Sequence, residues 1–210
     1  MNPVWIAGNA IAVVTGLICT SYLVWVRRKL ARTAFPIATV VLVAVTATIT
    51  AMQFVFPEVL ELFRRDPEAL RGGEVWRVIT PIFVQPSGVS QCVVNAFLLL
   101  AFMPMTEKLY GRWGLPVVYL GAGLLSQAFT YVWLPYGGGS SSAAFGLIGA
   151  IFCFLLRERR QAQLPFVVLP VVGLLAGVAL AFARDGHGAG MLLGAAIASG
   201  LPLVRFEFEK

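Results

Sequence analysis

The hydrophobic and polar positions along this 210-residue chain form long apolar runs separated by short polar breaks. Several runs reach the roughly 20 residues that an α-helix needs to cross a bilayer. The pattern predicts seven membrane spans, in order Val4–Val26, Pro36–Phe56, Ser90–Met105, Leu115–Leu134, Ser141–Leu156, Leu164–Ala183 and His187–Val204. We therefore expect an all-α polytopic membrane protein that forms one compact helical bundle.

Composition agrees with a membrane protein, because 59% of the residues are hydrophobic and 12% are charged. An average soluble domain is about half apolar and about a quarter charged. The net charge of +6 comes from short basic clusters between apolar runs, which are typical of topology signals. The scattered cysteines Cys19, Cys92 and Cys153 indicate neither a disulfide framework nor a metal site. We expect no nucleic-acid partner, no metal and no cofactor.

The charges of the connecting segments predict an orientation. The basic segments 27–32, 108–112 and 157–160 are expected in the cytoplasm, and the weakly charged segments 136–140 and 184–186 outside. This places the N-terminus outside and the C-terminus inside, in what we expect to be a bacterial cytoplasmic membrane. The first apolar run is longer than a typical signal-peptide core and has no basic residues before it, so we interpret it as an anchor.

The segment 57–85 does not follow the simple charge rule. It is long, it carries charges of both signs, and the order of the spans places it outside. Part of it is amphipathic, and Trp76 suits the headgroup level of a bilayer. We interpret it as an interfacial segment on the outer surface.

A glycine run leads into three serines where the span Ser141–Leu156 begins. Ser141 is the candidate nucleophile, because a serine hydroxyl becomes reactive once a base accepts its proton. The free N–H groups and the dipole at a helix N-terminus favour a developing negative charge there. The alternative is that Ser140 to Ser142 only cap a helix.

The only histidine of the chain, His187, begins another apolar run, and it is the candidate general base. Gly190 and Gly194 follow it with small-xxx-small spacing, which lets two helices approach closely. A histidine beside such a face would lie near the partner helix. The alternative is an isolated histidine in an interfacial loop, with a glycine face that serves packing alone.

Asn95 lies inside an apolar run, where a polar amide is costly unless it has a hydrogen-bond partner or a function. Gln91 precedes it by four residues, so both amides share one helix face and are candidate oxyanion donors. The alternative is a hydrogen bond between helices. Under the predicted orientation, Asn95, Ser141 and His187 lie near the same outer membrane face.

Taken together, four motifs resemble those of the rhomboid family of intramembrane serine proteases, over about residues 36–210. The family's serine motif is similar to the stretch that runs from Gly139 to Ala150, and this register selects Ser141. The remaining similarities are His187 with Gly190 and Gly194, the pair Trp76-Arg77, and the Glu-x-x-x-Gly pattern from Glu107 to Gly111.

The resemblance implies a six-helix protease core over residues 36–210, with residues 1–35 forming an extra N-terminal transmembrane helix and a basic loop. It makes residues 57–85 a membrane-embedded outer loop. It also implies a serine–histidine dyad without an aspartate, Ser141 with His187, and an aromatic ring at Phe145 against the histidine. The expected substrates are transmembrane segments of membrane proteins, cleaved near the outer face, with the lipid bilayer as the other partner.

The chain departs from the family pattern at two positions. The family's second core helix usually carries His-x-x-x-Asn, with another histidine earlier, and here Gln91 and Gln85 occupy the histidine positions while Asn95 is kept. A rhomboid-like pseudoprotease that binds membrane helices without cutting them is therefore the alternative. An unrelated bundle or transporter would instead need polar groups near the bilayer midplane. The sequence does not indicate an oligomeric state.

Overall fold

The computed structural model describes residues 3–26 and 35–204. The helices are α1 (Pro3–Val26), α2 (Ile37–Val55), α3 (Pro57–Phe63), α4 (Pro67–Arg71), the 3₁₀ turns η2 (Val75–Val78) and η3 (Thr80–Phe83), α5 (Val89–Thr130), α6 (Ser141–Arg157), α7 (Pro165–Phe182) and α8 (Gly186–Gly200). The basic segment 27–32 and the tail 205–210, on which part of the orientation prediction depends, lie outside the described residues. The predicted all-α fold is confirmed.

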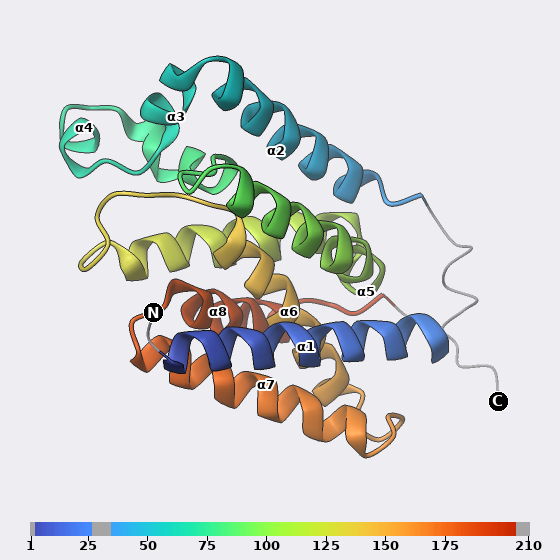
Figure 1. The fold of residues 1–210 in the computed structure, drawn as a ribbon. Coiled ribbons are helices and arrows are strands. Elements are labelled where there is room, and N and C mark those ends of the chain that lie inside the picture. Colours follow the sequence, from blue (N-terminus) through green and yellow to red (C-terminus); the bar gives the residue numbers. More distant parts are fainter. Residues whose placement is uncertain (1–2, 27–34, 205–210) are drawn as a thin grey trace.

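The helices form one bundle around α6, which runs through its centre (Figure 1). On one side α1 and α7 lie next to each other, and α2 lies on the opposite side against α5. Helix α8 packs most extensively against α6. The ends of α6 and α8 that begin at Ser141 and Gly186 thus lie close together.

Helix α5 contains two of the predicted spans, because the chain turns back on itself at Gly111 (Figure 1). Gly111 has φ 78° and ψ 172°, a backbone conformation that side chains with a Cβ rarely adopt. The second arm ends at Thr130, four residues before the predicted end at Leu134, since the segment after Thr130 forms a turn.

Helix α6 is short and buried, with every residue from Ala143 to Leu155 shielded from solvent. Its 17 residues span about 25 Å at about 1.5 Å per residue, which is less than the roughly 30 Å of a hydrocarbon core. At its C-terminal end Arg157 donates to the carbonyls of Ala198 and Leu201 and favours the aqueous boundary. With Arg157 at one aqueous boundary, a helix of this length would end, at Ser141, short of the opposite boundary.

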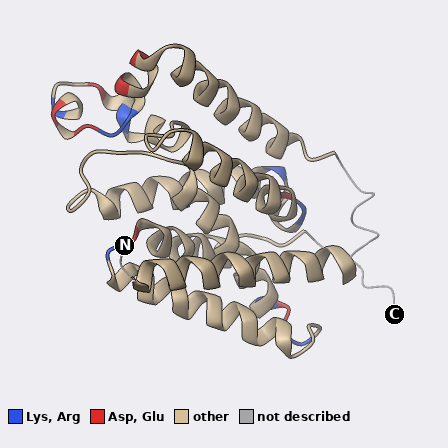
Figure 2. Cartoon of the chain, in the orientation of Figure 1, with Lys and Arg blue, Asp and Glu red and all other residues tan. Residues whose placement is uncertain are grey.

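Among the residues that the structure describes, the charged ones lie mostly at the two ends of the bundle, and its middle is almost free of them (Figure 2). In the described part of the chain, α1, α2, α5 and α7 are long and apolar enough to cross a membrane, and α6 is a shorter apolar helix. A middle without charge suits the bilayer interior, where ionised groups are costly. The chain is an integral multi-pass membrane protein.

Candidate active site

The first turn of α6 has no side-chain cap. Ser140 occupies the N-cap position with helical backbone angles, φ −76° and ψ −4°, and its hydroxyl caps no amide of the helix. The amides at the start of a helix have no intrahelical acceptor. The interpretation of these serines as simple caps therefore loses its main support, and the uncapped amides remain available for a negatively charged atom.

The three serines have different surroundings. Ser140 is fully buried, and its Oγ accepts a hydrogen bond of 3.3 Å from Gln85 Nε2. Ser142 lies against α8, where its backbone carbonyl occupies the space that a Cβ on Gly190 would need. Ser141 is partly exposed, and its Oγ makes no hydrogen bond to another described residue. Ser140 is thus engaged by Gln85, whereas the hydroxyls of Ser141 and Ser142 make no hydrogen bond within the described chain. Ser141 is the one that lies beside Gly139 and the Gln91 amide.

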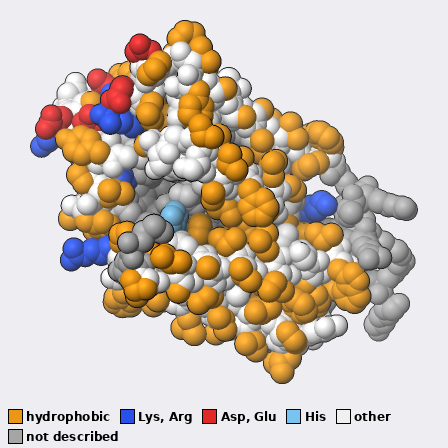
Figure 3. Space-filling view, viewed as in Figure 1, with side chains coloured by type: hydrophobic (Ala, Val, Ile, Leu, Met, Phe, Trp, Pro, Cys, Tyr) orange, Lys and Arg blue, Asp and Glu red, His pale blue; other side chains and the backbone are white. Residues whose placement is uncertain are grey.

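His187 lies in the first turn of α8 and faces α6. Its ring stacks on Phe145, with a centroid distance of 4.6 Å and an interplanar angle of 25°. The side chain is 32% exposed, and the imidazole, in pale blue, is visible at the surface of the molecule (Figure 3). Phe145 follows Ser141 by four residues. Its phenyl ring, on which the imidazole stacks, therefore lies one helical turn after Ser141 on the same face of α6.

No hydrogen bond joins Ser141 to His187 among the contacts of residues 3–26 and 35–204. The two side chains are instead related through Phe145 and through the crossing of α6 and α8. Catalytic hydrogen bonds are often long in enzymes without substrate and shorten in the substrate complex. The structure thus places a hydroxyl and an imidazole on neighbouring helix ends, without a hydrogen bond between them.

Glycines on both helices make the crossing of α6 and α8 close. A Cβ on Gly194 would overlap the carbonyl oxygen of Gly146, and one on Gly149 would overlap that of Met191. Gly190 is similarly tight against Ser142. The glycine face identified in the sequence thus brings the two backbones into direct contact and sets the position of His187 relative to Ser141.

The amide of Asn95 is buried and already has a partner. Its Nδ2 donates a hydrogen bond of 2.7 Å to Gln85 Oε1, and Gln85 in turn donates to Ser140. The backbone N–H and carbonyl of Gln85 are both bound by the side chain of Gln53 on α2. Gln85, which stands where the family usually has a histidine, therefore links α2, α5 and the start of α6.

Gln91 lies nearer to the start of α6 than Asn95 does. Its Oε1 accepts from the Ser87 N–H at 2.8 Å, and its Nε2 donates to the Gly138 carbonyl at 3.3 Å. A Cβ on Gly139 would collide with this Nε2 and would lie 3.7 Å from Ser141 Oγ. Gly139, with φ 130°, thereby allows the Gln91 amide and the Ser141 hydroxyl to share one small space.

A cavity of about 310 Å³ lies between α2 and α5, on the other side of these amides. Its walls are mostly apolar, and Gln85, Asn95 and Ser140 are the polar groups nearest to the site. Neither Ser141 nor His187 lines it. Gln85 and Asn95 therefore lie between the cavity and the candidate site.

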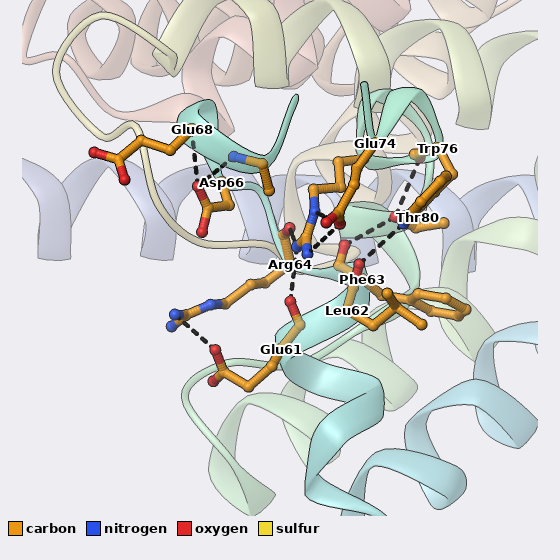
Figure 4. A network of polar contacts seen from close by, with 11 residues as sticks. Glu61, Leu62, Phe63, Arg64, Asp66, Glu68, Glu74, Trp76 and Thr80 are labelled. Carbon is orange, nitrogen blue, oxygen red and sulfur yellow. Dashed lines mark hydrogen bonds and ion pairs between the residues drawn. The ribbon is translucent and has the colours of Figure 1, made fainter. Parts of the chain in front are cut away.

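Trp76 and Arg77 contribute to the internal structure of the 57–85 loop. Trp76 Nε1 donates to the Leu62 carbonyl, and Thr80 Oγ1 donates to the Phe63 carbonyl (Figure 4). Arg77 is buried and pairs with Glu74 at 2.6 Å while donating to two backbone carbonyls of the same loop. All of these contacts lie within residues 57–85, so the pair supports the loop and does not touch Ser141.

Arg65, which the sequence did not single out, connects this loop to the segment that leads into Ser141. Its buried guanidinium donates to the carbonyls of Pro135 and Leu134 and to the side chains of Gln127 and Thr130. The backbones of Arg65 and Gly137 also form an isolated antiparallel bridge. A non-helical segment at membrane depth needs such partners for its polar groups.

Asp185 was also missed, and it lies directly beside His187. Its Oδ1 accepts from the His187 N–H at 2.9 Å and lies 2.9 Å from the His187 Nδ1, while its Oδ2 accepts from Asn9 of α1 at 2.9 Å. Burial alone would raise the pKa of this carboxyl, but the contacts and charge of His187 and the Asn9 amide hold it below its ordinary value. Asp185 was recognisable as a helix N-cap, and Asn9 as a lone amide in an apolar helix.

Among the residues that the structure describes, no three His, Cys, Asp or Glu side chains lie close enough together to hold a metal ion. The groups at the site are a hydroxyl, an imidazole, a carboxylate, amides and helix N–H groups.

Comparison with known proteins bears on this arrangement. Residues 72–202 match the family model described as a rhomboid domain. The chain is 32% identical to rhomboid protease GluP of Bacillus subtilis over 138 residues, which cover 62% of this chain and 27% of GluP. It is 34% identical to YdcA of the same bacterium over 92 residues, 42% of this chain and 45% of YdcA. Rhomboid-like protease 2 of Toxoplasma gondii is 27% identical over 66% of this chain, and 52% of that relative is covered. The matches thus span between about a quarter and half of the relatives' lengths.

Proposed function

This chain belongs to the rhomboid family, and we propose that it is an intramembrane serine endopeptidase that cleaves transmembrane segments of membrane proteins. The observation that carries the proposal is the stacking of the His187 ring on Phe145, one helical turn from Ser141. This contact holds an imidazole against the helix end that bears a free hydroxyl and uncapped amides. The relatives GluP and rhomboid-like protease 2 are named as proteases, which agrees with the proposal.

In the proposed reaction His187 Nε2 accepts the Ser141 proton while Oγ bonds to the scissile carbonyl carbon. The resulting oxyanion is stabilised by the Ser141 N–H, by Gln91 and by the Asn95 N–H that does not bind Gln85. His187 then passes the proton to the leaving amine, the C–N bond breaks, and an acyl-enzyme remains. Water attacks this ester with the same histidine as base, which releases the second product and restores Ser141.

The uncapped start of α6 and the recessed position of Ser141 favour a reaction on a membrane-embedded segment. An oxyanion donor that is removed typically lowers the rate by about 10²–10³-fold. The replacement of a family histidine by Gln91 keeps a neutral donor in place, because an amide has two N–H groups.

We further propose that the site faces the outer side of a bacterial cytoplasmic membrane. Arg157 lies at the end of α6 opposite to Ser141 and donates to the Leu201 carbonyl. Lys108 and Arg112 lie near the same end, because Val204 donates to the carbonyl of Leu109. These basic residues favour the cytoplasm under the positive-inside rule. The beginning of α1 lies at the Ser141 end, since Trp5 Nε1 donates to the Ala183 carbonyl at 2.9 Å. The N-terminus would then be outside, in agreement with the expectation from the sequence.

The test is labelling of the detergent-solubilised protein with a fluorophosphonate probe, which modifies activated serines. Wild type should be labelled, and both Ser141→Ala and His187→Ala should lose labelling by at least about 100-fold, because nucleophile and base act as a unit. Ser142→Ala is the matched control and should keep most of the signal. If Ser142→Ala alone lost labelling, the nucleophile would be Ser142 and the assignment to Ser141 would be wrong.

A pseudoprotease that binds transmembrane helices is the second candidate. The observations that favour it are the open Ser141–His187 contact and the Asn95 amide that is bound to Gln85. In that case folded wild type would remain unlabelled, while a photocrosslinker placed near Ser141 would still capture a transmembrane peptide. Gln91→His would then be the first variant to test for gained labelling.

A further inference from the structure

The environment of His187 Nδ1 is the feature that the proposed dyad leaves unexplained. This nitrogen is shielded from solvent and has no aligned hydrogen-bond partner, although the ring as a whole is partly exposed. The Asp185 Oδ1 lies 2.9 Å away, within ion-pair distance. The contact meets the distance of an ion pair but not the angle of a ring N–H hydrogen bond, so we interpret it as electrostatic.

Asp185 is held in place by several independent contacts. Its carboxylate is 10% exposed, and its Oδ1 also accepts from the His187 backbone N–H as the N-cap of α8. Its own N–H donates to the Leu180 carbonyl at 2.9 Å. The preceding residue, Arg184, adopts a left-handed conformation with φ 61°, which is unfavourable for a residue with a Cβ. The turn between α7 and α8 is thus fixed in a strained shape that presents the carboxylate to the imidazole.

Helix α1 supports this turn from outside the six-helix core expected for the family. Asn9 Nδ2 donates to Asp185 Oδ2 at 2.9 Å, and the same nitrogen donates to the Trp5 carbonyl, which fixes the amide on its helix. Trp5 itself donates to Ala183, and Trp133 donates to Arg184 from the other side at 2.9 Å. Two indoles and one amide therefore hold three consecutive residues of the turn.

We propose that Asp185 orients His187 and stabilises its protonated form, and that α1 positions Asp185 through Asn9; this inference rests on the proposed protease function. A carboxylate beside Nδ1 favours the tautomer with the proton on Nδ1 and leaves Nε2 free to accept the Ser141 proton. The resulting imidazolium gains a nearby opposite charge on a carboxylate that is largely shielded from solvent. Asp185 is a positioning residue in this scheme, because it acts through His187 and touches no reacting atom.

Asp185→Asn is the main test variant, because asparagine is also a good N-cap and so preserves the start of α8. We expect kcat for cleavage of a transmembrane reporter substrate to fall about 100-fold with KM within about twofold, a smaller loss than the roughly 10⁴-fold known for a fully hydrogen-bonded triad aspartate. Asn9→Leu keeps an apolar helix and should lower kcat about tenfold, because the carboxylate remains but loses one anchor. Thr20→Val is the matched control on α1, since the Thr20 hydroxyl is buried without a partner, and it should leave kcat unchanged.

A second readout does not depend on activity. His187 is the only histidine, so ¹⁵N-histidine labelling reports on this ring alone. Wild type should show the proton on Nδ1, and Asp185→Asn should move it to Nε2, since an amide can donate to Nδ1. An unchanged tautomer together with unchanged kcat in Asp185→Asn would overturn the inference, while labelling of Ser141 would leave the proposed function standing. Wild-type kcat and tautomer in Asn9→Leu would overturn the role of α1. An inactive, unlabelled wild type would overturn the function, and the tautomer measurement would then still decide the His187–Asp185 pairing.

Discussion

The two sides of Ser141 are built in opposite ways. Toward α8 the helices meet backbone to backbone through Gly146, Gly190 and Gly194, with no room for a single added carbon atom. Toward α2 and α5 the chain leaves a cavity of about 310 Å³ behind Gln85 and Asn95. The close side fixes a distance between two functional groups, whereas the open side tolerates variation in volume.

The two sides of Ser141 thus differ in how accurately their functional groups are positioned. The position of His187 depends on a helix crossing, and a crossing can be set accurately only where side chains do not intervene. The amides on the other side are positioned by hydrogen bonds among Gln53, Gln85 and Asn95, which hold direction without close packing. Three substitutions test the contrast.

Gly194→Val should have the largest effect. The new side chain would overlap the Gly146 carbonyl, so α6 and α8 must separate and Ser141 and His187 must move apart. We expect a loss of fluorophosphonate labelling of at least about 100-fold and a loss of stability of about 3 kcal/mol, at the upper end for overpacked sites. Gly200→Ala on the same helix is the control, because no atom lies within 4 Å of its added Cβ. Equal behaviour of the two variants would contradict the close crossing.

Gln85→Ala should have an intermediate effect. It leaves the Asn95 amide and the Ser140 hydroxyl buried without their partner, which typically costs about 1–3 kcal/mol. We expect labelling to slow about tenfold and thermal unfolding in detergent to shift downward. Gln161→Ala removes an exposed amide at the opposite end of the bundle and should change neither quantity. If Gln85→Ala changed neither labelling nor thermal unfolding, the hydrogen bond between Gln85 and Asn95 would not support the site.

Ala96→Leu should have the smallest effect. Ala96 lines the cavity between α2 and α5, so three added carbon atoms can occupy existing space. We expect the free energy of unfolding to change by less than about 1 kcal/mol and labelling to stay within about twofold, measured beside Gly194→Val. A loss comparable to that of Gly194→Val would mean that the α2–α5 side is as tightly constrained as the α6–α8 side.

Much of the fold was predictable because hydropathy in a membrane protein is a strong, local signal. The spans and their order follow from the apolar runs, and the reversal at Gly111 matches the break between two predicted spans. The end of the second arm was wrong by four residues, since Tyr131 to Leu134 are apolar enough to continue a helix and the turn there depends on contacts with Arg65. Hydropathy does not encode such contacts.

The candidate site was predictable only in part. Ser141, His187 and the glycines carry recognisable spacing, and the structure brings their helix ends together. The partners of Asn95 and His187, Gln85 and Asp185, were not foreseen even though they are near in sequence, because hydropathy and spacing do not show which side chains meet. Asn9 and Asp185 are 176 positions apart, and only the packing of α1 beside α7 brings them into contact. A lone asparagine in an apolar helix signals a buried partner but does not identify it.

The contact between Asn9 and Asp185 also has a consequence for biogenesis. A ribosome that adds about 5–20 residues per second needs about 10–35 s to make the 176 positions that separate them. During that interval the Asn9 amide has only its partner within α1, the Trp5 carbonyl, and the turn that carries Asp185 does not yet exist. Completion of the candidate site is thereby tied to insertion of the last helices, so under the proposed function a half-made chain would lack its base and could not cleave neighbouring membrane proteins.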